Sequence, residues 1–79
     1  MNVLQRPDWS GEPVRLSVRW TLVKGGRAIQ CVLYSHQFGW ELRMAYAQTL
    51  VRSHVCRSEE EVFTTQEEWK AAMQTKGWH

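Results

Sequence analysis

Two cysteines and two of the three histidines are the first candidates for binding a transition metal: Cys31, His36, His54 and Cys56. Structural zinc needs four ligands that converge as a tetrahedron, and they usually come from short Cys-x-x-Cys or His-x-x-x-His pairs. The strand pattern described below turns Cys31 inward, whereas His36 and the His54-x-Cys56 pair point outward from different strands. Because the four side chains do not converge, the sequence predicts no metal site and no cofactor.

Catalysis by a nucleophile or by paired carboxylates is not expected either. Cys56 and His54 share a strand face, but side chains two residues apart on a strand run parallel and do not meet. The acidic runs 59–61 and 67–68 are predicted to be solvated helix charges. Gly25-Gly26 is typical of a hairpin turn rather than of a phosphate-binding loop. We therefore predict a non-enzymatic protein without a small-molecule substrate.

Arginines alternate with apolar residues and offer a surface that could bind nucleic acid. An arginine fork binds phosphate in a bidentate manner, and an aromatic ring on a sheet can stack on a base. The simpler interpretation is a solvated face whose arginines pair with Glu41 or Glu12. Acidic residues in the C-terminal segment also weaken long-range attraction to phosphate. The candidate binding face comprises Arg15, Arg19, Val32, Tyr34, His36, Arg43, Arg52 and His54.

A protein partner or a second copy of the chain is the preferred interpretation of the same surface. An open sheet has two unpaired edges, and such edges invite pairing with another strand. Val32 and Tyr34 are predicted to point outward and add apolar area. Trp9 and Trp78, near the two ends, are candidates for exposed aromatic contacts. We expect a binding module for protein or for itself as a homodimer, with nucleic acid as the alternative partner.

The first hairpin is the clearest structural signal in the sequence. Apolar and polar residues alternate from residue 14 to 24, and Gly25-Gly26 then supplies the positive φ angles of a two-residue turn. That turn sets the register of the following strand. The predicted cross-strand pairs are Leu22 with Ile29, Trp20 with Cys31, and Val18 with Leu33.

A second hairpin follows, with a tight turn at Ala47-Gln48. A two-residue turn there would place Met44 opposite Val51 and Trp40 opposite Val55. Val51 and Val55 would then face inward. The outward residues of the last strand would be Arg52, His54 and Cys56.

A helix is predicted after the strands. Ser58 with Glu61 fits the capping box, in which a hydroxyl caps the helix and a glutamate three residues later reaches back. Gly77 suits a left-handed C-cap. Thr65 with Glu68 forms a second capping box, so a start at Thr65 is the alternative. Apolar or bulky residues recur at helical spacing: Val62, Gln66, Trp69 and Met73.

These patterns together predict one α+β domain. The chain has 79 residues, 43% of them hydrophobic, and five tryptophans, enough for one modest core. Trp20, Trp40 and Trp69 are expected to close that core. The N-terminus lacks signal-peptide features and no apolar run approaches a membrane span, so we expect a cytoplasmic protein with reduced, half-buried cysteines and no membrane contact. The prediction is an irregular arm at 1–13 and a domain at 14–79, with antiparallel meander strands at about 14–24, 27–35, 39–46 and 49–57 and a helix at about 59–76 packed on one face.

Overall fold

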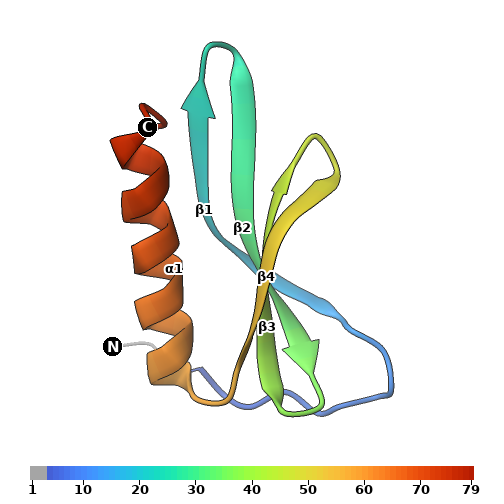
Figure 1. The fold of residues 1–79 in the computed structure, drawn as a ribbon. Coiled ribbons are helices and arrows are strands. Elements are labelled where there is room, and N and C mark those ends of the chain that lie inside the picture. The colour runs from blue at the N-terminus through green and yellow to red at the C-terminus, as the bar shows by residue number, and fades with distance from the viewer. Residues whose placement is uncertain (1–3) are drawn as a thin grey trace.

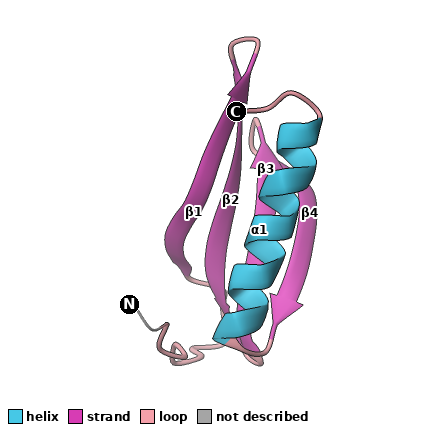
Figure 2. Cartoon of the chain, turned by 90° about the vertical axis from the view of Figure 1, so that its left-hand side faces the viewer, coloured by secondary structure: helices cyan, strands magenta, loops and turns pink. Residues whose placement is uncertain are grey.

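The computed structural model describes residues 4–79. It confirms an α+β fold in which one helix lies across one face of a four-stranded antiparallel sheet (Figures 1 and 2). The strands follow one another in chain order across the sheet, as expected for a meander. Within the described residues no helix is both long and apolar enough to cross a bilayer. The elements are β1 (Arg15–Lys24), β2 (Arg27–His36), β3 (Gly39–Tyr46), β4 (Thr49–Cys56) and α1 (Glu59–Thr75).

Helix α1 begins where the first capping box predicts. The Ser58 Oγ accepts a hydrogen bond from the Glu61 backbone N–H at 3.1 Å. Three glutamates occupy the first turn, where the helix dipole favours negative charge. Because the chain is already helical before Thr65, the alternative start at Thr65 is wrong, and the Thr65 side chain is instead buried against the sheet side of the helix.

The helix ends in a Schellman motif. Gly77 has a φ of 94°, the Gly77 N–H donates to the Gln74 carbonyl, and the Trp78 N–H donates to the Met73 carbonyl. The chain then turns back toward β1. There the last residue, His79, forms two backbone hydrogen bonds with Val23, at 3.2 and 2.9 Å.

Three tryptophans close the core, as predicted. Trp20, Trp40 and Trp69 are 8%, 5% and 3% exposed. The Trp20 indole N–H donates to the Gln66 carbonyl of α1 at 2.9 Å, so its buried polar atom has a partner. The core also contains Leu22, Ile29, Cys31, Leu33, Leu42, Met44, Cys56 and Val62.

The register of the first hairpin is confirmed near its turn and wrong farther away. Leu22 pairs with Ile29 and Trp20 with Cys31, but an irregularity follows between Val18 and Trp20. A β-bulge places one extra residue on one strand, which reverses the faces of the residues beyond it. Val18 therefore pairs with Val32 rather than Leu33 and is 43% exposed.

A bulge in β4 corrects the prediction for that strand. The turn has two residues as expected, since Tyr46 pairs with Thr49 and Ala45 with Leu50. Val51 is then skipped, so Met44 pairs with Arg52. The inward and outward residues of β4 are exchanged beyond this point, which turns Arg52, His54 and Cys56 toward α1 and leaves Val51 exposed and Val55 half-buried.

The two hairpin turns share a backbone conformation but not a sequence. Gly25 and Gly26 have φ angles of 56° and 77°, while Ala47 and Gln48 have 48° and 65°. Left-handed backbone costs a residue with a Cβ about 1–2 kcal/mol relative to glycine. Replacing Ala47-Gln48 with Asn-Gly should therefore raise the free energy of unfolding by roughly 1 kcal/mol, measured by urea denaturation.

The matched control for this prediction is the reverse exchange. Replacing Gly25-Gly26 with Ala-Gln should lower the free energy of unfolding, since both glycines also adopt positive φ. An unchanged urea midpoint for both exchanges would contradict the prediction that the left-handed backbone of Ala47 and Gln48 costs stability.

Candidate functional site

The sheet face turned away from α1, called the open face below, has a hollow of about 500 Å³. Residues of β1, β2 and β3 and of the turn after β3 line this hollow. Its lining contains two arginines and no acidic residue, so the only charges around this hollow are positive. Among the lining residues are Arg15, Arg27, Val32, Tyr34, Ala45 and Gln48.

Part of the predicted binding face lies on the open face. Arg15, Val32, Tyr34 and Arg43 are there. The Arg43 guanidinium lies 4.2 Å from the centre of the Tyr34 ring and forms an ion pair with Glu41 at 2.8 Å, so this arginine already has internal partners. Val32 was expected to be an outward contact but is only 6% exposed, because its neighbours on the face cover it.

Three other residues of the predicted face lie on the opposite, helix-facing side. The Arg19 Nε donates to the Gln66 Oε1 of α1 at 2.7 Å. The Arg52 guanidinium lies 5.0 Å from the centre of the Trp69 ring, and the His54 Nε2 is 2.8 Å from the Glu61 carboxylate. The irregularity beside Arg19 in β1 and the bulge at Val51 in β4 are the cause, and the four predicted arginines therefore do not share one surface.

The aromatic residues near the chain ends differ from each other. Trp9 is 38% exposed, with its ring 6.0 Å from that of His36 at the end of β2. Trp78 is half-buried and packs edge-on against Tyr46 at 6.4 Å. Trp9 is thus an exposed aromatic, whereas Trp78 covers one end of the core.

The two sheet edges are also unequal. Val23 is the second strand residue from the β1–β2 turn, and both its backbone hydrogen-bonding groups bind His79. Leu50 has the equivalent position in β4, where backbone groups of a two-residue hairpin point away from the partner strand. Leu50 and Val51 are 56% and 54% exposed. The exposed apolar pair on β4 was not foreseen, because the predicted register placed Val51 inward.

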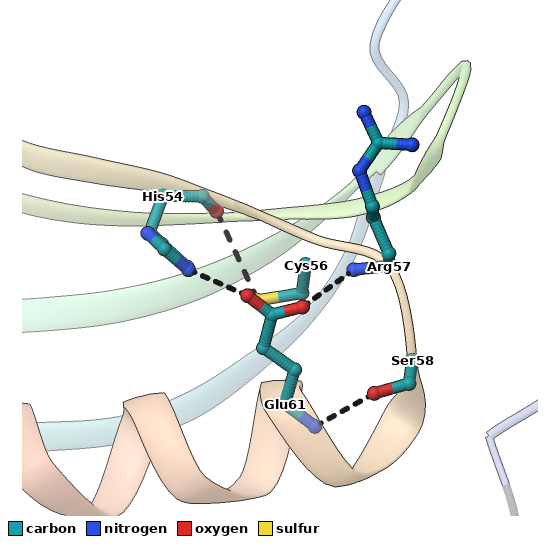
Figure 3. Close-up of polar contacts among 5 residues, drawn as sticks. All are labelled: His54, Cys56, Arg57, Ser58 and Glu61. Atoms are coloured by element: carbon teal, nitrogen blue, oxygen red, sulfur yellow. Dashed lines mark hydrogen bonds and ion pairs between the residues drawn. The ribbon is translucent and has the colours of Figure 1, made fainter.

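A cluster of His54, Cys56 and Glu61 lies between the end of β4 and the first turn of α1 (Figure 3). One Glu61 carboxylate oxygen accepts from the Arg57 backbone N–H at 2.9 Å, and the other is 2.8 Å from the His54 Nε2. The Cys56 thiol points to the His54 carbonyl oxygen at 3.9 Å. Glu61, expected to be a solvated helix charge, is instead held in this cluster.

The charge state of the two cysteines argues against nucleophilic chemistry. Burial, and after it the Glu61 carboxylate, raise the pKa of Cys56 to about 11 against the opposing effect of a hydrogen bond with Thr65. Burial likewise raises the pKa of Cys31 to about 12. Both cysteines are free and fully buried rather than half-buried. Both are therefore thiols at neutral pH, whereas a nucleophile must be a thiolate.

Hydrogen bonds also set the charge of Glu61. The backbone N–H of Arg57 lowers the pKa of this carboxyl below its ordinary value of 4.5, and the hydrogen bond with His54 lowers it further. The cluster therefore holds a carboxylate beside a neutral thiol.

The sequence matches no protein-family model, and no curated protein or solved structure matches the chain.

Proposed function

We propose that the protein is a non-enzymatic binding module that self-associates through the edge of β4. The observation that carries this proposal is the exposed apolar pair Leu50-Val51 on that edge. An unpaired strand offers a row of backbone donors and acceptors to another strand, and proteins usually protect such edges with charge or with a covering segment. Within the described residues, no hydrogen bond from outside the sheet reaches Leu50.

The other edge of the sheet is a poorer docking strand. β1 has two irregularities in its pairing with β2, and its end near the turn is already paired with His79. A bulge bends the strand and increases its twist, which hinders further strand addition. β4 has one such irregularity, at Val51, but within the described residues no segment outside the sheet pairs with the backbone of its end near the turn. This contrast favours β4 as the edge that pairs with another chain.

A second copy of this chain fits the edge because the exposed residues of β4 next to the turn, Thr49 to Val51, carry no charge and include two apolar side chains. Two β4 strands related by a two-fold axis would pair antiparallel, so that each copy contributes the same residues. Repulsion between like charges is small there, because the nearest charged side chain, Arg52, lies over Trp69 of its own chain. Leu50 also adjoins Val32 and Ala45 on the open face, so pairing would extend an existing apolar surface.

Nucleic acid ranks behind self-association as the partner. Around the hollow only Arg15 and Arg27 remain as unpaired cations within the described part of the chain. Affinity for a duplex rises with the number of phosphates neutralised, and two contacts give weak, strongly salt-dependent binding.

Light scattering coupled to size-exclusion chromatography tests the proposal. We expect the wild-type protein at tens of micromolar to have twice the 9.3 kDa mass of the chain. Leu50→Lys should shift the mass to that of the monomer, because it places two like charges opposite each other at the paired edge.

The matched control is Val23→Lys, since Val23 is 42% exposed and has the equivalent hairpin position on β1. This variant should retain the dimer mass. Circular dichroism melting should show that both variants are folded. A wild-type monomer at several hundred micromolar, or dissociation by Val23→Lys and not by Leu50→Lys, would refute the proposal.

A further inference from the structure

The cluster at the end of β4 combines three different metal ligands. The His54 Nε2, the Cys56 Sγ and a Glu61 carboxylate oxygen lie within 4.8 Å of one another. In a tetrahedral zinc site with bonds of 2.0–2.3 Å, ligand atoms are separated by roughly 3.3–3.8 Å. The three atoms are thus within about 1 Å of the spacing that one zinc ion requires.

We propose that His54, Cys56 and Glu61 form a Zn²⁺ site with these three side chains as ligands and water in the fourth position. Two of the ligands are exposed enough to adjust, since the side chains of His54 and Glu61 are 46% and 38% exposed. The third, Cys56, is fully buried and fixes the inner end of the site. This inference is independent of self-association.

The backbone gives this trio its arrangement. The bulge at Val51 turns His54 and Cys56 to the same, helix-facing side of β4. Ser58 caps α1 and thereby fixes the first turn, from which Glu61 reaches back to the strand (Figure 3). The Arg57 N–H holds one carboxylate oxygen of Glu61 and leaves the other directed at His54. In known metal sites, hydrogen bonds to the atom of a side chain that does not bind the metal hold that side chain in the orientation for binding.

Charge balance also favours a divalent cation. The Glu61 carboxylate lies beside the Cys56 thiol. Zn²⁺ would displace the thiol proton to solvent, and the resulting thiolate and carboxylate together would neutralise the ion. The Thr65 hydroxyl, which hydrogen-bonds the sulfur, would remain to stabilise the thiolate.

This set of three ligands was not predicted from the sequence. Cys31 and His36 were the other candidate ligands beside His54 and Cys56, the four were predicted not to converge, and neither Cys31 nor His36 belongs to the cluster. Glu61 replaces them, because capping of α1 brings a residue of the helix onto the strand.

Cobalt provides a direct spectroscopic test. Protein treated with a chelator and a reductant is titrated with Co²⁺, which occupies zinc sites and absorbs in the near ultraviolet when a thiolate binds it. We expect a thiolate-to-cobalt band that saturates at one ion per chain and disappears when Zn²⁺ is added. Zn²⁺ should also raise the melting temperature, because it binds only the folded state with high affinity.

Variants assign the ligands. Cys56→Ser should abolish the band, whereas Cys31→Ser, the matched control, should retain it. His54→Gln and Glu61→Gln replace exposed side chains and should weaken binding at least about tenfold, while His36→Gln should not. Leu50→Lys should retain the band, which separates this site from the proposed dimer.

Three results would overturn the inference. The first is no thiolate band in the wild-type protein with excess Co²⁺. The second is a band that is lost in Cys31→Ser and retained in Cys56→Ser. The third is a band of unchanged affinity in both His54→Gln and Glu61→Gln, which would mean that cobalt binds the thiol alone.

Discussion

Replacing Trp69 with alanine should leave most of the protein unfolded at 37 °C or in mild denaturant. Trp69 is 3% exposed and fills the space between α1 and the sheet, with the Arg52 guanidinium over its ring. Truncating a buried tryptophan costs about 3–5 kcal/mol through lost burial and the cavity left behind. A single core in a domain of this size rarely supplies more than about 3–5 kcal/mol of stability. Urea denaturation followed by circular dichroism measures the loss.

Trp9→Ala is the matched control for this substitution. Trp9 is 38% exposed, so its truncation should change the free energy of unfolding by less than about 1 kcal/mol. Cooperative unfolding of Trp69→Ala at a near-wild-type midpoint would show that α1 does not depend on this residue for its packing.

Gly39→Ala should destabilise the second hairpin more than any other glycine substitution in this sheet. Gly39 has a φ of 135°, which L side chains rarely adopt, and an added Cβ would lie 2.7 Å from the Cys56 carbonyl oxygen. The backbone conformation alone costs about 1–3 kcal/mol for a residue with a Cβ. The contact adds to this because the obstacle is backbone of the neighbouring strand. We expect a fall of several degrees in melting temperature.

Gly25→Ala separates the cost of the backbone conformation from the cost of the contact with the neighbouring strand. Gly25 also has a positive φ, 56°, but no atom lies within 4 Å of an added Cβ. Its substitution should therefore cost only about 1–2 kcal/mol. Equal losses for Gly39→Ala and Gly25→Ala would mean that β4 moves freely away from the added methyl group.

Local sequence determined the elements of this protein because each has a local physical cause. Alternating polarity marks the four strands to within one residue at either end. The Gly25-Gly26 turn set the adjacent pairs Leu22–Ile29 and Trp20–Cys31 correctly. Ser58 and Gly77 marked the two ends of the helix, and the tryptophans at 20, 40 and 69 marked the core.

Only the tertiary structure decided which side of the sheet many side chains occupy. A bulge is a small local change with no clear signature in composition, yet it reverses the facing of the residues beyond it, up to the next irregularity. The bulge at Val51 buries Cys56 and brings His54 to Glu61, and the irregularity beside Arg19 turns that arginine to the helix. The predicted basic face therefore separated into two surfaces, and the metal-ligating trio formed from residues on two elements. The bulges bury the Cys56 thiol and expose Val18 and Val51, an arrangement that the alternation of polarity alone does not predict.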